Sequence, residues 1–408
     1  MEADWKEYKA RNFCSSVTDG THDSPKPKEE GRYLITSKHL KDNQIDFSSA
    51  NRISEEEYLK VIARSAVEQF DILFSMIGTI GNVVQVKFKD VDFAVKNMGI
   101  FKMGGQEQRS TWLYYWLKSN YASEYINQRL SGSTQSYLTL ESLRDFPILY
   151  PGDVTAGKIV SILKSLDDKI ECNRRINDNL EQQAQALFKS WFVDFEPFKD
   201  GEFVESEMGM IPKGWRVGMF LENIEVMPGG TPSTSKEEYW NDGKIPFFSP
   251  KDVSGVYCFD TEKHITELGL NNCSSHLYPK DTLFITARGT VGKLALAGVD
   301  MAMNQSNYAL VAKKTVGKYY LYLLTQTLVA VLLKKSNGAV FSAITTKDFK
   351  EPIIMPPTLV IVDFENRVTP IFAKIHETSI ESRRLAQLRD TLLPRLMSGE
   401  LKVNELTL

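Results

Sequence analysis

The sequence predicts an α+β fold built as a tandem duplication. Two α/β domains are expected, separated by two long antiparallel helices and related by a pseudo-twofold axis. Three observations lead to this prediction. Matching residues recur in the same order in the two halves of the 408-residue chain. In each half, strand-like segments precede a long helical segment. The two helical segments carry similar apolar faces, which suits helices that pack against each other.

The internal repeat runs through the whole chain. Trp5 recurs as Trp215, and the pair Gly20-Thr21 recurs as Gly230-Thr231 at the same spacing. Asp71-Ile72-Leu73-Phe74 recurs as Asp281-Thr282-Leu283-Phe284, again at this spacing. Two later matches keep their order with small shifts in spacing: Gly78-Thr79-Ile80-Gly81 with Gly289-Thr290-Val291-Gly292, and Pro147-Ile148-Leu149 with Pro352-Ile353-Ile354. Because chance matches would not keep this order, we interpret the chain as a duplication.

The repeat divides the chain into four parts. Residues 1–150 and 212–356 are the two predicted globular domains, residues 151–211 a long helix with a connector, and residues 357–408 a second long helix. Short β-branched and aromatic runs predict strands at residues 71–77, 83–86, 146–151, 282–286, 308–311 and 352–357. Helices are predicted at residues 111–130 and 317–335, and the first long helix from about Thr155 to Trp191.

Each long helix has one face of regularly spaced residues. In the first helix these are Ile159, Leu163, Leu166, Ile170, Asn173, Asn177, Leu180, Ala184, Leu187 and Trp191. In the second they are Phe364, Val368, Ile371, Ile375, Thr378, Ser382, Leu385, Arg389, Leu392 and Leu396. The central residues of both faces are polar, which costs stability in a helix pair but fixes its register. The alternative is that each helix covers only its own domain.

Two prolines interrupt the second helical pattern. Thr369-Pro370 has no counterpart in the first half. This pair is expected either to kink the helix or to start it afresh, with Thr369 as the cap. Pro394 is expected to end its regular part.

Composition narrows the class of protein. The net charge is −3, so the chain alone should hold DNA phosphates weakly. No apolar run is long enough for a membrane span, and the charged start resembles no signal peptide. The four cysteines (Cys14, Cys172, Cys258 and Cys273) form neither a CxxC pair nor a zinc-ligand spacing. These features favour a cytoplasmic protein with reduced thiols and no membrane partner.

One family resemblance rests on the middle of the chain. The segment Leu187-Phe188-Lys189-Ser190-Trp191-Phe192-Val193-Asp194-Phe195-Glu196-Pro197, followed by Met210-Ile211-Pro212-Lys213-Gly214-Trp215, is similar to the central conserved region of type I restriction–modification specificity subunits (HsdS). The openings Asp19-Gly20-Thr21-His22 and Gly229-Gly230-Thr231-Pro232-Ser233-Thr234-Ser235, with Glu238-Tyr239-Trp240 and Ser249-Pro250-Lys251-Asp252, resemble recognition-domain openings of that family.

The resemblance implies a non-catalytic subunit that reads double-stranded DNA. Each of two target recognition domains would read one half of a bipartite target, and the helices would set the spacing. The helices would also dock two modification (HsdM) subunits, and restriction (HsdR) subunits would join for cleavage. No cofactor is expected on this chain, since S-adenosylmethionine belongs on the methyltransferase partner. The target bases and the spacer length do not follow from the sequence.

Candidate DNA contacts lie in the openings, the glycine turns and the amide-containing turns. In the first domain they are Gly20, Thr21, His22, Lys38, Gly78, Thr79, Gly81 and Asn97. In the second they are Gly230, Thr231, Ser233, Ser235, Lys251, Arg288, Gly289, Thr290, Gly292, Lys293, Asn304 and Gln305. Amides suit adenine, and an arginine suits guanine or a phosphate. The alternatives are glycines that serve turn geometry, structural amides and solvated lysines.

Candidate partner-docking residues lie on the long helices. They are Ile170, Leu180, Leu187, Trp191, Ile375, Leu385 and Leu392. Trp191 and Phe192 suit either a core or a docking role.

No catalytic motif is found in the sequence. It holds no Asp/Asn-Pro-Pro-Tyr methylation motif and no glycine-rich cofactor loop, and the five histidines are scattered. No metal site is expected. The competing hypothesis is a self-contained DNA methyltransferase or nuclease with a diverged site, which binding of S-adenosylmethionine by the purified chain would support. A third hypothesis is a scaffold whose domains no longer bind DNA.

Overall fold

The computed structural model describes residues 5–41, 43–132, 136–313, 316–335 and 343–403. The chain forms two units. Unit 1 comprises Met1–Lys169 and Arg384–Leu408, and unit 2 comprises Ile170–Arg383. Each long helix therefore begins in one unit and ends in the other.

Unit 1 contains a four-stranded antiparallel sheet in the order β2-β10-β7-β8. Its strands are β2 (Ser16–Asp19), β10 (Met98–Lys102), β7 (Ile72–Ser75) and β8 (Val83–Gln85). A three-stranded sheet follows the order β6-β3-β9, with β6 (Asn51–Ile53), β3 (Arg32–Ile35) and β9 (Phe93–Val95). Two pairs complete the unit: β1 (Lys6–Lys9) with β11 (Pro147–Tyr150), and β4 (Leu40–Lys41) with β5 (Gln44–Ile45). The predicted strands at residues 71–77, 83–86 and 146–151 are confirmed with shorter bounds.

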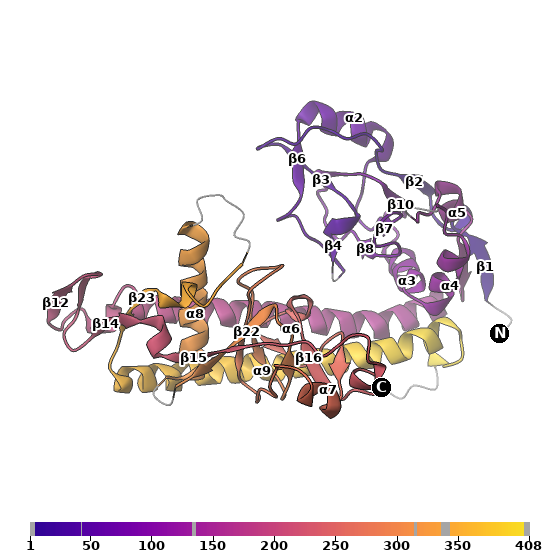
Figure 1. The fold of residues 1–408 in the computed structure, drawn as a ribbon. Helices are drawn as coiled ribbons and strands as arrows, with labels where there is room; N and C mark the ends of the chain where they lie inside the picture. The colour runs from indigo at the N-terminus through magenta and orange to yellow at the C-terminus, as the bar shows by residue number, and fades with distance from the viewer. Residues whose placement is uncertain (1–4, 42, 133–135, 314–315, 336–342, 404–408) are drawn as a thin grey trace. The chain divides into compact units, whose positions relative to one another are not determined.

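The helices of unit 1 pack beside these sheets (Figure 1). They are α1 (Ala10–Phe13), α2 (Glu55–Ser65), α3 (Glu107–Leu117), α4 (Asn120–Gln128) and α5 (Leu140–Arg144). The prediction of one helix at residues 111–130 is wrong, because α3 ends at Leu117 and α4 begins at Asn120. Ser119 ends the first helix through a hydroxyl bond to the Trp116 carbonyl at 2.6 Å, and it caps the second by accepting from the Ala122 N–H.

Unit 2 repeats this architecture. Its main sheet has the order β15-β22-β19-β20-β17, with β15 (Ile224–Pro228), β22 (Asn307–Ala312), β19 (Leu283–Thr286), β20 (Leu294–Ala297) and β17 (Tyr257–Cys258). A second sheet has the order β18-β16-β21, with β18 (His264–Ile265), β16 (Ile245–Phe248) and β21 (Ala302–Met303). The two-stranded pairs are β14 (Arg216–Met219) with β23 (Pro352–Met355), and β12 (Phe203–Ser206) with β13 (Gly209–Pro212). The helices are α7 (Glu267–Asn271) and α8 (Lys318–Lys335).

The strand orders confirm the duplication. The order β2-β10-β7-β8 of unit 1 corresponds to β15-β22-β19-β20 of unit 2, and β6-β3-β9 corresponds to β18-β16-β21. In both small sheets the central strand pairs in parallel with its C-terminal neighbour, β3 with β9 and β16 with β21. Unit 2 differs by the extra edge strand β17, which pairs in parallel with β20.

The two long helices are α6 (Asp153–Phe192) and α9 (Thr358–Met397), each of 40 residues (Figure 1, magenta and yellow). The alternative that the second long helix starts afresh at Thr369 is wrong, because α9 is continuous there, and Thr369 donates its hydroxyl hydrogen to the Glu365 carbonyl at 2.7 Å. Val368 and Phe372, on either side of Pro370, are fully buried, and their packing stabilises the continuous helix despite the proline. The helix also continues three residues past Pro394, which does not end it as expected.

Within unit 2 the helices run antiparallel, as predicted. Asn173 of α6 donates to Glu381 of α9 at 2.8 Å, whereas Trp191, further along α6, meets Phe364 near the start of α9. Asn173 and Thr378 are almost completely buried, which confirms a polar layer in the seam. In this layer Asn177 accepts from the Thr378 hydroxyl and donates to Ser379 Oγ at 3.1 Å. Ser382 instead donates to the carbonyl of Thr378 in its own helix.

Unit 1 holds its own contact between the two helices. Arg389 of α9 donates to Asp167 of α6 at 2.6 Å, and Tyr115 of α3 donates to the other oxygen of the same carboxylate at 2.8 Å. Burial raises the pKa of Tyr115, and the neighbouring Asp167 charge raises it further. The tyrosine therefore stays protonated and acts as a donor in this network.

Candidate nucleic-acid interface

Three connections of unit 1 leave its sheets at the same end. Strand β2 ends at Asp19, which pairs with Gly99 near the start of β10. Strand β7 ends at Ser75, which pairs with Met98. The opening at residues 20–22, the turn at residue 97 and the turn at residues 78–81 are therefore neighbours. The sequence-predicted candidates of the first domain come together at this sheet end.

The opening loop of unit 1 lies directly against the β9–β10 turn. A Cβ on Gly20 would overlap the Val95 carbonyl oxygen, so this close approach requires glycine. The N–H of Thr21 donates to that carbonyl at 3.0 Å, and the N–H of Asn97 donates to the Thr21 carbonyl at 3.0 Å. Asn97 has a positive φ of 54°, so its backbone is held in a left-handed turn. Gly20 and Thr21 thus place the opening loop beside the amide of Asn97.

A hydrogen-bonded chain of side chains crosses this contact. His22 Nδ1 lies 2.9 Å from Asn97 Oδ1, and His22 Nε2 lies 2.8 Å from Asp19 Oδ2. The other oxygen of Asp19 accepts from Arg64 Nη2 at 2.6 Å. Asp19 is buried whereas His22 is exposed. The chain therefore leads from a buried carboxylate to the surface, and sequence reasoning did not find its members Asp19 and Arg64.

The glycine turn of unit 1 adopts the geometry that glycine favours. Gly78 and Gly81 have φ values of 80° and 92°, and the Gly81 N–H donates to the Ser75 carbonyl at 3.1 Å. Both glycines therefore serve the turn itself, and Thr79 is left exposed at its tip. A Cβ on Gly78 would lie 3.5 Å from Ser37 Oγ, so the short 3-10 turn that carries the exposed Lys38 is adjacent.

Unit 2 builds the equivalent sheet end. Strand β15 ends at Pro228 opposite Tyr308, and Thr286 at the end of β19 lies opposite Asn307 at the start of β22. A Cβ on Gly229 would overlap the Asn304 carbonyl, and one on Gly230 would overlap Ser274 Oγ. The second opening loop therefore also approaches its turn through glycines. The Gly230 N–H donates to the Met303 carbonyl at 3.1 Å.

The two adjacent amides of unit 2 have different roles. Asn304 Oδ1 accepts from the Ser306 N–H at 2.9 Å and from Asn307 Nδ2 at 2.7 Å, so this amide stabilises its own turn. Gln305 is exposed, and its Oε1 accepts from the Thr231 hydroxyl of the opening loop. Asn304 therefore fits the alternative of a structural amide, whereas Gln305 stays a candidate DNA contact.

The second glycine turn carries exposed cations. Gly289 and Gly292 each have a φ of 83°. Arg288 and Lys293 flank them and are exposed, and neither forms a side-chain ion pair with any residue that the structure describes. Thr290 Oγ1 donates to the Pro250 carbonyl at 3.5 Å, which joins this turn to the 3-10 turn that carries exposed Lys251.

The remaining candidates of unit 2 lie in the opening loop. Ser233 and Ser235 are exposed and hydrogen-bond to each other at 2.9 Å between hydroxyl oxygens. The Ser233 carbonyl accepts from Trp240 Nε1 at 3.1 Å, which fixes the loop on the domain. The sheet end of unit 2 thus presents hydroxyls, one amide and three unpaired cations, a set that suits phosphates and base edges.

Comparison with known proteins identifies the family. The family model described as type I restriction modification DNA specificity domain matches residues 4–182 and again residues 212–386. The chain belongs to this family. It is 33% identical over 304 residues to the type I restriction enzyme MjaIX specificity subunit of Methanocaldococcus jannaschii, a match that covers 73% of this chain and 70% of that protein. It is 26% identical over 465 residues to the HindI specificity subunit of Haemophilus influenzae, covering 98% and 100%.

A solved structure supports the fold. The crystal structure of the S subunit of a type I restriction–modification system from M. genitalium superposes with a TM-score of 0.53 at 14% sequence identity, and it covers 97% of this chain and 96% of that one. The predicted fold class and the predicted place among type I specificity subunits, which are non-catalytic, are confirmed. The alternative of a self-contained methyltransferase or nuclease is not favoured by this family membership.

The predicted partner-docking residues divide by burial. Trp191 and Ile375 lie in the core of unit 2, where Trp191 packs on Phe364 with ring centroids 5.6 Å apart. Their bulk stabilises the helix pair and leaves little surface for another protein. Half-buried members retain exposed surface that a specificity subunit can offer to partners: Ile170, Leu180, Leu187, Leu385 and Leu392.

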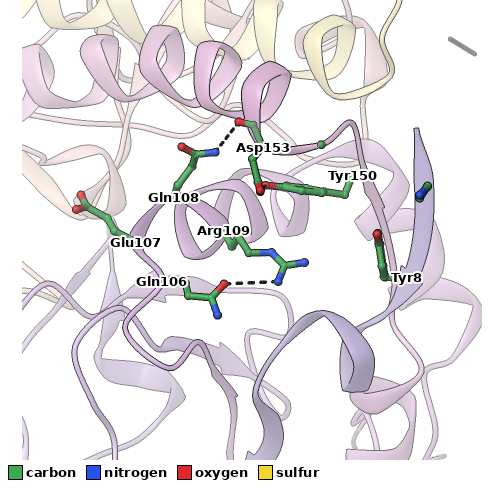
Figure 2. Close-up of a pocket in the computed structure, with 9 residues that line it drawn as sticks. Tyr8, Gln106, Glu107, Gln108, Arg109, Tyr150 and Asp153 are labelled. Atoms are coloured by element: carbon green, nitrogen blue, oxygen red, sulfur yellow. Dashed lines mark hydrogen bonds between the residues drawn. The ribbon is translucent and has the colours of Figure 1, made fainter. Parts of the chain in front are cut away.

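A pocket of about 730 Å³ in unit 1 was not foreseen from the sequence. Figure 2 shows Arg109 lying near Tyr150, and Gln108 reaching to the start of α6, where its Nε2 donates to the Asp153 carbonyl at 2.6 Å. The guanidinium of Arg109 sits over the rings of Phe13 and Tyr150, at 4.5 and 5.4 Å from their centroids. Acidic and basic groups both line the pocket, and the Tyr150 hydroxyl donates to Asp153 Oδ1 at 2.5 Å.

Over the residues that the structure describes, no three His, Cys, Asp or Glu side chains are grouped so as to hold a metal ion. No helix in the described ranges is long and apolar enough to cross a membrane.

Arg288→Ala tests the exposed cation of unit 2. If Arg288 makes a bidentate contact with guanine, the variant should lose about 1–3 kcal/mol of discrimination in one half-site. Arg288→Lys is the matched control, because lysine keeps the charge but cannot make the paired contact. Competition binding with half-site variants measures the effect. Equal weakening on every DNA sequence, restored by lysine, would instead identify a phosphate contact.

Proposed function

We propose that this specificity subunit reads a bipartite DNA target, with the sheet end of unit 1 contacting one half-site and that of unit 2 the other. The proposal rests on the sheet end that is duplicated in the two units. In both units the opening loop donates a backbone N–H to the end of the strand that precedes the amide, from Thr21 to Val95 and from Gly230 to Met303, and a glycine turn leaves the same sheet end. Because the side chains at these positions differ, the two half-sites should differ in sequence.

The proposal extends to the partners and the cofactor. Two modification (HsdM) subunits would bind along α6 and α9, and restriction (HsdR) subunits would join them for cleavage. S-adenosylmethionine would bind to the modification subunits, and this chain would hold no cofactor. The net charge of −3 supports such an assembly, since partners must supply much of the electrostatic attraction to phosphates. The complex would act in the cytoplasm, where the bacterial or archaeal chromosome lies.

The purified chain should neither methylate nor cut DNA, whereas its complex with the modification subunit should methylate adenine within a split motif. Single-molecule methylome sequencing of a host with and without the gene measures this and also names the target. Methylation by the highly purified chain alone would contradict the proposal. So would an unchanged methylome after deletion of the gene in a host with an active modification subunit.

A further inference from the structure

Both units hold one exposed or half-buried amide against the opening loop. In unit 1 it is Asn97, in the turn between β9 and β10, and its partner is His22. In unit 2 it is Gln305, between β21 and β22, and its partner is Thr231. The two partners lie one position apart in the repeat, since Thr21 is the equivalent of Thr231. The opening loop of each unit therefore contacts an amide at a different position of the repeat, and it does so through a different side chain.

The amide of Asn97 has two orientations, and the ring of His22 decides between them. The Asp19 carboxylate is paired with Arg64, so its second oxygen only accepts, and His22 Nε2 must be the donor at 2.8 Å. With a proton also on Nδ1, the ring donates to Asn97 Oδ1 and the NH₂ group is turned away from the ring. A neutral ring has an acceptor at Nδ1, so the amide must turn over and direct its oxygen away from the ring.

The orientation of Gln305 is set without a titratable group. The Thr231 hydroxyl donates to Gln305 Oε1, which turns the oxygen toward the loop and leaves the NH₂ group directed outward. Asn304 does not compete for this role, because its Oδ1 accepts from Ser306 and Asn307 within its own turn. The side chain of Gln305 is also one methylene longer than that of Asn97, so the two units present their amides at different reach.

We propose that Asn97 and Gln305 are the base-reading amides of the two units, and that His22 and Thr231 determine which amide group faces the DNA. This inference rests on the proposed function. An outward NH₂ donates to the acceptors of guanine, or to O4 of thymine, in the major groove. An outward oxygen accepts from the amino groups of cytosine or adenine. With the amide oxygen of Asn97 facing the His22 ring and that of Gln305 facing the Thr231 hydroxyl, both NH₂ groups are directed outward.

The charged groups around His22 come from three elements besides its own loop. Asp19 ends β2, Arg64 lies in α2, and Lys96 follows β9 with its ammonium donating to Ser24 Oγ at 2.5 Å. Asp23 follows His22 in the loop, and its backbone N–H donates to the Thr21 hydroxyl at 3.1 Å. Removing the Asp19 carboxylate with Asp19→Asn takes away the charged acceptor that fixes Nε2, so the base preference of this half-site should weaken.

The test uses the complex of the full chain with its modification subunit and a set of DNA duplexes with one base changed at a time. Gln305→Ala should reduce discrimination at a single base pair of one half-site by about five- to 150-fold, and Asn97→Ala should do so in the other half-site. Gln305→Glu replaces the NH₂ by an acceptor and should shift the preference toward cytosine. Asn304→Ala is the contrast, because it should lower the melting temperature while the base preference near Gln305 persists.

The variant His22→Ala separates the role of His22 from a structural one. It should weaken the base preference of the Asn97 half-site, while the preference of the other half-site and the melting temperature of the complex stay constant. Unchanged preferences in folded Asn97→Ala and Gln305→Ala would overturn the inference and leave the proposed function standing. A wild-type complex that yields no bipartite motif would overturn the proposed function, and this inference with it.

Discussion

Replacing residues 212–356 by the equivalent segment of a relative should change one half of the methylated motif and leave the other half intact. The replaced segment contains every candidate DNA contact of unit 2, from Gly230 to Gln305. The candidates of unit 1 all lie outside it. Methylome sequencing of a host that carries the exchanged chain gives both half-sites in one measurement.

The structure shows why this exchange keeps the fold. The segment begins at Pro212, the last residue of β13, and ends just after β23. Strand β14, which follows Pro212, pairs antiparallel with β23, with Arg216 opposite Met355, so this pair brings the two ends of the segment together. The long helices are retained from the parent chain.

One contact must be preserved for the exchanged domain to fold. Tyr320 of α8 packs against Phe192 of α6, with ring centroids 5.0 Å apart, and Glu365 of α9 accepts from the Tyr319 and Tyr320 N–H groups at 3.0 Å. Burial raises the pKa of Glu365, whereas these two N–H groups lower it. A donor segment with an aromatic residue at position 320 is the suitable choice, and a donor without one serves as the unstable control. A change in the wrong half-site would refute the modular model.

The parts of the fold that sequence could predict are those governed by local pattern. The duplicated strands around Leu73 and Leu283 are buried on both faces, and such apolar runs stand out in any sequence. The helix faces were predicted correctly for the same reason: Ile159, Leu163 and Leu396 are buried where the spacing places them. The break after Leu117 was missed because the apolar pattern continues past Ser119, whose capping role depends on its hydrogen bonds.

The hydrogen bonds of the candidate site could not be predicted without the tertiary structure. Asn304 and Gln305 are neighbours of similar chemistry, and only the bonds from Ser306, Asn307 and Thr231 separate a structural amide from an exposed one. Asp19 and Arg64 lie 45 positions apart and meet through a strand and a helix, so no spacing could indicate their pair. Local sequence motifs located the ends of the sheets. The hydrogen bonds between the loops at those ends determine which side chains remain exposed.

Lengthening both long helices should lengthen the spacer between the half-sites. The boundary between the units crosses α6 after Lys169 and α9 after Arg383. Four helix-forming residues inserted at each of these points leave the Asp167–Arg389 pair in unit 1 and the Asn173–Glu381 bond in unit 2. Insertion between Asn173 and Leu180 would instead disturb the polar layer, so the boundary is the better site.

The expected change follows from helix and DNA geometry. Four residues add about 6 Å along an α-helix and turn it by about 40° beyond a full turn. One base pair of B-DNA advances about 3.4 Å and turns about 35°. The permitted spacer should therefore grow by one or two base pairs, while both half-site sequences stay the same, because neither sheet end is altered. Methylome sequencing of the double-insertion variant measures the new spacer.

A single insertion provides the matched control. Four residues in α6 alone shift its unit 1 part by a turn relative to its unit 2 part, so the Asp167–Arg389 pair and the Asn173–Glu381 bond cannot both form, and the complex should lose activity. The double insertion restores the register and should restore methylation with the longer spacer. If the double-insertion variant methylates fully at the original spacer, the helices do not set the distance between half-sites.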